Sequence, residues 1–408
     1  MKIISRRKFF KYSALATTSL LIPDFLKGFA NAGAAVNPEL IRSLRAGSKL
    51  IVIQLSGGND GLNTVIPFRN DIYYELRPKI SIKENEVLKL NDEAGLNPEM
   101  KKLKEIYDKG NLCIINNVGY PNPDRSHFRS MDIWQSGSSS DEYINTGWIG
   151  RYLDSDCPDC INPYNAIGVD SNLVMALKGN KRNGMAVDNP GRFYMNTTEK
   201  YFLELAEQSK NHNEDTNVSY LYKTLAETTS SADYIYNNSG IYKSSRDYPD
   251  SAFGKNLKTV SEMIISDIDT SVYYVTLSGF DTHVNQNGRQ DRLLKEFSEG
   301  VHSLTEDLRE NGMLDSTLIM TFSEFGRRVS QNAGGGTDHG TANNLFLISG
   351  SLKKYGFYNS LPDLRNLESG DLKYEIDFRR VYATILRNWL NADDRKIMGK
   401  EFELLNIV

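Results

Sequence analysis

The sequence lacks the features that mark several large classes of protein. It contains only three cysteines in 408 residues. Beyond the N-terminal region no stretch approaches the ~18 consecutive apolar residues of a membrane span. The net charge is −4, so no basic field favours nucleic acid as a partner. We find no internal repeat, no coiled-coil heptads and no GxGxxG spacing, which argues against repeat architectures and against a dinucleotide-dependent oxidoreductase.

The few cysteines give a weak signal. Cys157 and Cys160 form one CxxC with no second pair, which is compatible with a redox motif, a metal site or a local disulfide. A local disulfide is favoured if the compartment is oxidising. Cys113 lies in an apolar segment, and we expect it to be inert core.

The N-terminus has the pattern of an export signal. Paired arginines, Arg6 and Arg7, are followed by Phe9, a weakly apolar stretch at 14–29 and the small-residue site Ala30-Asn31-Ala32. We predict a twin-arginine signal peptide at 1–32, read by the twin-arginine export machinery, which exports proteins already folded. Residues 33–48 form a lead-in, and the mature protein is expected in the periplasm or outside the cell. No cysteine lies at the cleavage region, which argues against a lipoprotein.

The remainder alternates between apolar runs and amphipathic segments. This alternation predicts an α/β fold over 49–408, a three-layer αβα sandwich with a mostly parallel central sheet. The predicted strands lie at 50–55, 112–115, 166–168, 185–187, 271–277, 318–320 and 345–348. The predicted helices lie at 101–109, at 126–134, from about 293 to 310, and after Asp377. A span rich in tyrosine, asparagine and serine, at about 190–267, is predicted to be a helical insertion.

Carboxylates and imidazoles follow several predicted strands. The candidate metal ligands at these positions are Asp60, Asp281, His283, Glu324, Asp338 and His339. In open α/β sheets, ligands bind beyond the carboxyl ends of the strands, so we expect these side chains to converge. Together they supply the ligand types of divalent ions, and we predict one or two ions per chain, either zinc, calcium or magnesium. Each position also has a local explanation: an Asx turn at Asp60, a helix cap at Glu324 and a turn at Asp338.

A second group of candidates surrounds the predicted helix at 126–134. Two prolines hold the approach extended, so Ser126 and His127 are placed at the helix N-terminus, which favours anions. We predict both as catalytic residues, with Ser126 as the nucleophile, although a plain N-cap is the alternative for that serine. Arg129 and Arg327 are candidate clamps for a tetrahedral anion, or else surface residues. Phe128, Met131 and Trp134 are expected to face inward.

These motifs in combination resemble a known family. They are the twin-arginine signal, the segment 54–63, Arg125 to Phe128, Gly279 to His283, Ser323 to Arg327, and Gly336 to Gly340. The chain is similar to domain-of-unknown-function family 1501 over nearly its whole length. That family is grouped with the alkaline phosphatase and sulfatase superfamily, so the resemblance implies an alkaline-phosphatase-like fold.

The resemblance also implies how the candidate residues divide between two ions. Asp60 and Glu324 would share one ion with Ser126, and Asp281, His283 and His339 would share the other. The chain departs from the superfamily pattern in three places. Asp281 and His283 are separated by only one residue; Glu324-Phe325 stands where an Asp-His pair is usual, with Asp338 as an additional acid; and Asn97 stands where histidine is expected.

The sequence therefore supports two functions of different classes. The first is an exported metal-dependent hydrolase of phosphate or sulfate esters with a two-metal site and a serine nucleophile. The second is a non-catalytic surface or carbohydrate-binding protein that retained the fold.

Overall fold

The computed structural model describes residues 47–156, 162–200, 202–204 and 217–408, with the side chains of 217–223 left out. The predicted signal peptide, nearly all of the lead-in, Cys157 and Cys160 lie outside the described residues, and the predictions for them stand as expectations. Among the described residues, no helix is both long and apolar enough to cross a membrane.

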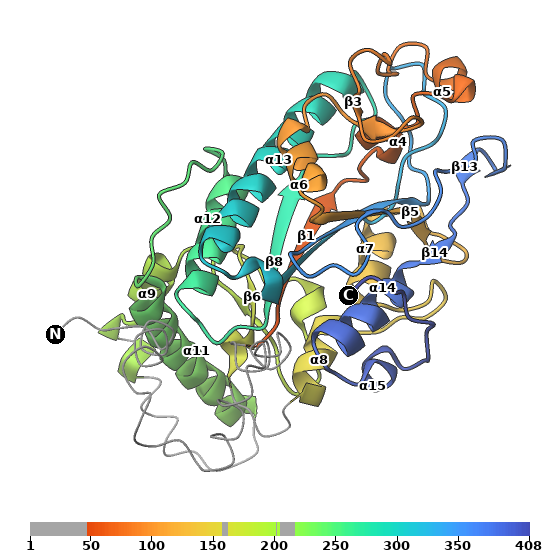
Figure 1. Cartoon of the computed structure of the whole chain (residues 1–408). Coiled ribbons are helices and arrows are strands. Elements are labelled where there is room, and N and C mark those ends of the chain that lie inside the picture. The colour runs from red at the N-terminus through yellow and green to blue at the C-terminus, as the bar shows by residue number, and fades with distance from the viewer. Residues whose placement is uncertain (1–46, 157–161, 201, 205–216) are drawn as a thin grey trace, which may run out of the picture.

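A nine-stranded sheet lies at the centre of the described structure (Figure 1). The strand order is β11-β5-β10-β9-β1-β8-β6-β7, with β14 also pairing with β5. The strands are β1 (Lys49–Ser56), β5 (Leu112–Gly119), β6 (Ala166–Gly168), β7 (Met185–Ala186), β8 (Val272–Ser278), β9 (Thr317–Phe322), β10 (Asn343–Ile348), β11 (Gly356–Phe357) and β14 (Ile376–Asp377). All seven predicted strands are present. The predicted mixed α/β fold with a mostly parallel sheet is confirmed.

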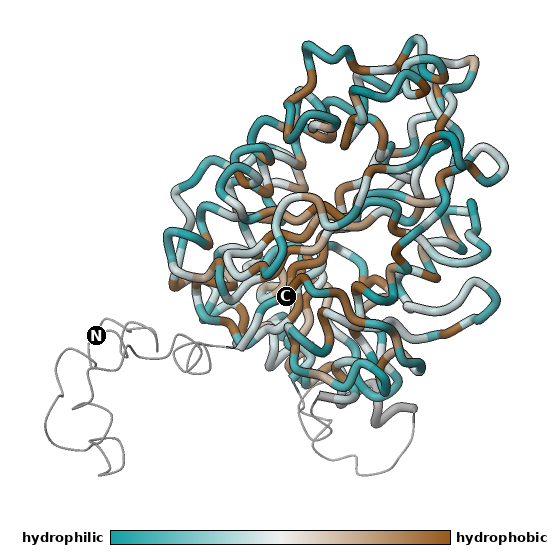
Figure 2. Tube along the Cα trace, turned by 45° about the vertical axis from the view of Figure 1, so that its right-hand side comes forward, coloured by the Kyte–Doolittle hydropathy of each residue, from teal (hydrophilic) through white to brown (hydrophobic). Residues whose placement is uncertain are grey.

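The core lies on both faces of this sheet because successive strand residues point to opposite sides. In β1, Ile51 and Ile53 join one core cluster, whereas Leu50 and Val52 join the other. Both faces of a central strand are therefore apolar, as a sheet covered on two sides requires. Hydrophobic residues accordingly concentrate along the central strands in Figure 2.

Helices cover both faces and complete three layers. The first core contains residues from α6 (Lys101–Asp108), α12 (Ala252–Ile265) and α13 (Gln286–Glu310). The second contains residues from α7 (His127–Ser136), α8 (Trp148–Asp156), α14 (Phe378–Thr384) and α15 (Asp394–Met398). The two sets lie on opposite sides of the sheet in Figure 1.

The rest of the chain adds smaller elements around this sandwich. Two small antiparallel sheets are formed by β2 (Val65–Ile66), β3 (Leu88–Lys89) and β4 (Gly95–Leu96), and by β12 (Leu367–Glu368) and β13 (Asp371–Leu372). The short helices α4 (Gly61–Thr64) and α5 (Asp71–Leu76) follow β1, and α9 (Pro190–Thr197) and α11 (Asn217–Ser239) precede α12. Three single turns (Pro163–Asn165, Met175–Leu177 and Leu314–Ser316) are 3₁₀-helical, and Ile385–Trp389 continues α14 as a π-helix.

Two features of the fold determine which loops meet. β10 runs antiparallel to both β9 and β5, so the start of β10 lies at the same edge as the ends of β9 and β5. β1 lies between β8 and β9 and is parallel to both. The loops that follow β1, β5, β8 and β9 therefore share one edge of the sheet.

The prediction that Phe128 faces inward is wrong. Its residue surface is 87% exposed, whereas Ile133 and Trp134 later in α7 are buried. The reason is the position of the helix, because α7 begins at the sheet edge and only its later turns pack beneath the sheet. Trp134 stacks on Phe378 and Phe322 there, with ring centroids 4.3 and 5.1 Å away.

The predicted insertion at about 190–267 contains α9, α11 and α12. Phe253, Leu257 and Val260 of α12 belong to the same core cluster as β8 and α13. α12 is therefore part of the sandwich, and the extent of any insertion stays a prediction.

Candidate metal centre

Three imidazoles and one carboxylate meet at the shared edge of the sheet. The Oδ1 atom of Asp281 lies 3.5 Å from Nε2 of His127, 3.0 Å from Nε2 of His283 and 3.2 Å from Nε2 of His339. The Nε2 atoms of His283 and His339 are 3.0 Å apart. We call these four residues the histidine cluster. They come from the start of α7, the loop after β8 and the loop before β10.

Each imidazole of the cluster is oriented by a partner on its other nitrogen. Nδ1 of His127 lies 2.9 Å from Oε1 of Glu324. Nδ1 of His339 donates to the carbonyl oxygen of Arg125 at 2.8 Å. Nδ1 of His283 lies 3.3 Å from Oδ1 of Asp338.

All three outer partners of the imidazoles are hydrogen-bond acceptors. A proton on each Nδ1 leaves a lone pair on each Nε2, and each Nε2 lies 3.0–3.5 Å from Oδ1 of Asp281. This is the arrangement in which metal-binding histidines are usually held.

The electrostatics of the cluster differ from residue to residue. Burial lowers the pKa of His339, and nearby Arg327 and His127 lower it further, which favours the neutral imidazole that a metal needs. The hydrogen bond with Glu324 raises the pKa of His127, and this outweighs the effect of burial. Burial raises the pKa of Asp281, but its interactions with Arg327 and the neighbouring imidazoles bring it down to about 2. Asp281 is therefore a carboxylate at neutral pH.

Three residues of the cluster, His127, Asp281 and His339, fit a divalent ion. The possible ligand atoms of His127, Asp281 and His339 all lie within 4.8 Å of one another. A tetrahedral site with metal–ligand bonds of ~2.0–2.1 Å separates its ligand atoms by about 3.3 Å. Oδ1 of Asp281 lies at 3.5 Å from Nε2 of His127 and at 3.2 Å from Nε2 of His339. Imidazole nitrogens with a carboxylate are the donor set of zinc and similar ions. In addition, Nε2 of His127 is buried without a hydrogen-bond partner among the described residues, as a ligand atom would be.

Glu324 lies beneath the cluster and is completely buried. Its Oε1 accepts a hydrogen bond from the backbone N–H of Gly57 at 2.8 Å as well as from His127. Its Oε2 is buried and has no hydrogen-bond partner in the described part of the chain. Glu324 therefore acts on the cluster through His127, whereas the resemblance implied that it contacts an ion directly.

Gly57 allows this close approach. Its φ of +117° is rarely adopted by residues with a side chain, and a Cβ there would lie 2.4 Å from the backbone nitrogen of Asp281. The loops after β1 and β8 can therefore meet only because residue 57 is glycine.

Asp60 is engaged in a buried ion pair. It lies at the end of β1, as predicted, and its Oδ2 is 2.6 Å from Nη1 of Arg77, with both side chains almost fully buried. The same Oδ2 also accepts from Gln286, and Oδ1 accepts from the backbone N–H of Leu62 as an N-cap. The described structure thus gives Asp60 partners of its own, separate from the histidine cluster.

The two predicted arginine clamps are also occupied by protein groups. Arg327 is buried and donates to Asp281 and to the carbonyl oxygens of four residues, Gly57, Gly58, Phe280 and Thr337. It joins the loops after β1, β8 and β9 and orients Asp281. Arg129 donates to carbonyl oxygens of residues 139, 140 and 142, and its guanidinium lies 3.8 Å above the ring of Tyr143.

Ser126 lies next to the cluster in the chain and is exposed. The residue before it, Arg125, accepts the hydrogen bond from His339, and the residue after it, His127, belongs to the cluster. Ser126 occupies the N-cap position of α7, but its side chain makes no capping hydrogen bond. Its hydroxyl is therefore not used as a cap.

Sequence reasoning missed several residues that build this edge. Arg77 and Gln286 both donate to Asp60, and Asn332 donates to Asp338. Phe325 packs against the rings of His127 and His339. Only Phe325 stood within a motif. Arg77 and Gln286 carry no sequence signal, because each finds its partner only through the tertiary fold.

Comparisons with solved structures give distant likenesses. A sulfatase from Pseudoalteromonas sp. is similar with 12% identity over 90% of this chain and 72% of that chain, with a TM-score of 0.41. A protein in the alkaline phosphatase superfamily from Vibrio parahaemolyticus has 10% identity over 87% and 70%, with a TM-score of 0.38. A phosphonate monoester hydrolase from Silicibacter pomeroyi has 8% identity over 88% and 78%, with a TM-score of 0.37.

No curated protein matches the chain. The model of one protein family matches residues 185–402, more than half of the chain and including three residues of the histidine cluster. The chain therefore belongs to the family described as protein of unknown function DUF1501.

Proposed function

We propose that the chain is a metal-dependent hydrolase of phosphate or sulfate esters. The observation that carries this proposal is the convergence of three imidazole Nε2 atoms on one oxygen of Asp281, each imidazole being oriented by a separate acceptor. His127, His339 and Asp281 would hold the ion, and His283 lies beside Asp281 and His339. A divalent ion held there supplies Lewis-acid polarisation of an ester oxygen and charge stabilisation in the transition state.

The chain's own residues contribute positioning and a nucleophile. Ser126 is exposed, free of a capping bond and at the N-terminus of a ten-residue helix, whose dipole stabilises negative charge on its hydroxyl oxygen. Glu324 and Asp338 hold two of the imidazoles in place. Arg327 fixes the carboxylate of Asp281 and ties the three loops together. In this proposal the hydroxyl of Ser126 gives up its proton and attacks the phosphorus or sulfur atom, and the ester bond breaks so that the alcohol leaves with a proton. Water then cleaves the ester formed on Ser126 and releases phosphate or sulfate.

The geometry supports one ion better than two. A second ion on Asp60 and Glu324 would have to compete with Arg77 for the Asp60 carboxylate. Removing one partner from a buried ion pair leaves an uncompensated charge, which typically costs ~3–5 kcal/mol. The unpaired Oε2 atom of Glu324 is the feature of the described structure that still favours a second ion.

The alternative is a binding protein that kept the fold but not the chemistry. One observation favours it, namely that neither Arg129 nor Arg327 is free to clamp a tetrahedral anion. In that case the protein would bind metal but would hydrolyse neither class of ester.

We further propose export in folded form, which the paired Arg6 and Arg7 motivate. Replacing both arginines with lysine should leave the protein in the cytoplasm.

The test compares two serine variants of the purified protein. Ser126→Ala should reduce hydrolysis of p-nitrophenyl phosphate or p-nitrophenyl sulfate by at least ~10³-fold, as expected for loss of a nucleophile. Metal content, measured by mass spectrometry, should remain that of the parent protein.

The matched control is Ser251→Ala, because Ser251 caps α12 by accepting from the backbone N–H of Gly254 at 3.0 Å. It should lose ~1 kcal/mol of stability and keep its activity. Full activity in Ser126→Ala would eliminate this serine as the nucleophile. A parent protein that binds metal but hydrolyses neither ester would favour the binding-protein alternative.

A further inference from the structure

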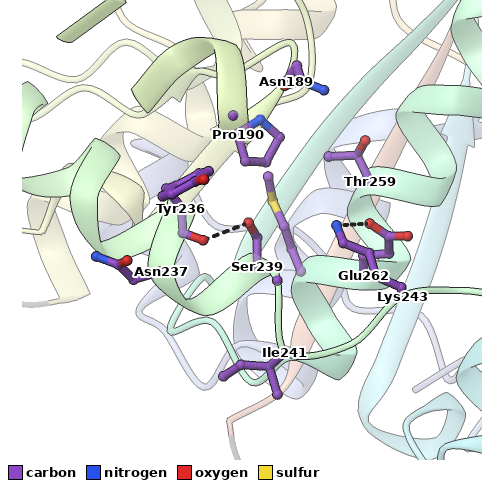
Figure 3. A pocket seen from close by; sticks show the side chains of 12 residues that line it. Asn189, Pro190, Tyr236, Asn237, Ser239, Ile241, Lys243, Thr259 and Glu262 are labelled. Atoms are coloured by element: carbon purple, nitrogen blue, oxygen red, sulfur yellow. Dashed lines mark hydrogen bonds and ion pairs between the residues drawn. The ribbon is translucent and has the colours of Figure 1, made fainter. Parts of the chain in front are cut away.

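A second concave site lies away from the histidine cluster, among the helices of the tyrosine-rich region. It is bounded by the start of α9, the end of α11, the loop that follows α11, and one face of α12 (Figure 3). Its volume is about 720 Å³, within the ~300–1,000 Å³ usual for ligand pockets. None of the residues predicted for the hydrolase site lines it.

One wall of this pocket is a rigid aromatic surface. Tyr236 of α11 stacks on Tyr194 of α9, with ring centroids 4.2 Å apart and an angle of 7° between the planes. The stack joins two helices and fixes the ring of Tyr236, which is nevertheless 44% exposed. Pro190 and Met263 supply further apolar surface. A ring that is already fixed offers contact area and loses little conformational entropy when a ligand binds.

The opposite wall carries polar groups whose charges balance. Nζ of Lys243 lies 2.8 Å from Oε2 of Glu262, and Oε1 of Glu262 accepts from the backbone N–H of Ser244. Thr259 lies beside this pair, and the amide of Asn189 lies at the rim (Figure 3). Amide, hydroxyl, ammonium and carboxylate groups together offer both hydrogen-bond donors and acceptors. The ion pair leaves no net charge to select an anion.

We propose that this pocket binds a neutral oligosaccharide. A sugar ring has an apolar C–H face, which fits against an aromatic ring, and a perimeter of hydroxyl groups that both donate and accept hydrogen bonds. These are the two surfaces that Tyr236 and the Lys243–Glu262 pair present across the pocket. An anionic ligand would meet a lysine whose charge is already offset by Glu262. The pocket is thus independent of ester hydrolysis at the histidine cluster.

One glycine of the pocket wall allows a blocking variant. A Cβ added to Gly240 would meet no atom within 4 Å, so a large side chain there enters open space instead of the core. Gly288, in the first turn of α13, is likewise open and does not line the pocket. Gly240→Trp and Gly288→Trp therefore form a matched pair.

The experiment is saturation-transfer NMR on the intact protein with maltotriose, cellotriose and mannotriose as separate probes. We expect saturation transfer to at least one trisaccharide, with loss of most of the signal in Gly240→Trp and in Tyr236→Ala. Gly288→Trp and the cluster variant His339→Ala should keep the parent signal. Thermal unfolding of each variant verifies that it is folded. Lys243→Met is a second route if a pocket variant fails to fold, and it too should lose most of the signal.

Three outcomes would overturn the proposal. The first is absence of transfer to all three probes. The second is an undiminished signal in folded pocket variants. The third is displacement of a bound trisaccharide by inorganic sulfate or phosphate, which would indicate an anion site. His339→Ala should lose ester hydrolysis but keep the trisaccharide signal. Failure of the pocket proposal is therefore distinguishable from failure of the hydrolase proposal.

Discussion

The histidine cluster and the tyrosine-walled pocket hold their side chains in different ways. At the cluster, His127 bonds to Glu324, 197 positions away, and His339 bonds to Arg125, 214 positions away. At the pocket, Asn237 bonds to Asp233 and Ser239 to Tyr236, both within a single helix. The cluster is thus positioned by contacts between loops of the folded sheet, whereas much of the pocket is presented by the surface of helices. Substitutions should therefore have larger effects at the cluster.

The largest effect is expected when a residue of the cluster is removed. His339→Ala deletes one of three converging imidazoles, so metal affinity should fall by more than the ~10–100-fold typical for loss of an outer partner. Ester hydrolysis should be lost with it. Metal content by mass spectrometry is the measurement, and His302→Ala is the control, because His302 pairs with Glu105 on α6 at 3.0 Å. Undiminished metal content in His339→Ala would contradict the proposed centre.

The buried pair of Asp60 and Arg77 should have the largest effect on stability. Arg77→Leu leaves the carboxylate of Asp60 buried without its cation, which should lower the free energy of unfolding by ~3–5 kcal/mol. Urea denaturation measures the change, and adding Asp60→Asn to Arg77→Leu should restore part of it. Metal content per folded molecule should remain unchanged. If Asp60→Asn alone removes the metal, Asp60 is a ligand and our one-ion assignment fails.

An intermediate effect is expected at the carboxylate that orients His127. Glu324→Gln retains the shape of the side chain but weakens the acceptor for the imidazole, so metal affinity should fall ~10–100-fold. Equilibrium dialysis against zinc measures this change. The matched control is Glu105→Gln, which removes the same charge beside His302. Equal affinities in the two variants would show that Glu324 does not act on the centre.

The smallest effects on stability are expected for two asparagines, one beside the histidine cluster and one at the pocket. Asn332 donates to the carbonyl of His283 and to Asp338, and it accepts from two backbone N–H groups, so Asn332→Ala should cost ~1–3 kcal/mol. Asn237→Ala breaks a bond within one helix and should change stability by less than ~0.5 kcal/mol. Thermal unfolding compares the two. Similar losses would mean that the two regions are held equally firmly.

Much of the fold was predictable because its signals are local. The apolar runs of β1, β8 and β9 and the apolar stripe of α13 identify buried strands and a docked helix without knowledge of their partners. Phe128 shows the limit of this reasoning. Its helical spacing suggested an inward face, but the first turn of α7 extends beyond the sheet that would have covered it.

The sequence by itself determined which chemical groups lie at the ends of β1, β8 and β9, because those groups follow the strands directly. The tertiary structure decided what each group does. Glu324 and Asp338 contact imidazoles, Asp60 pairs with Arg77, and Arg327 binds backbone carbonyl groups. The physical reason is that a carboxylate or guanidinium takes the nearest complementary group. Which group is nearest depends on the packing of loops that are distant in sequence.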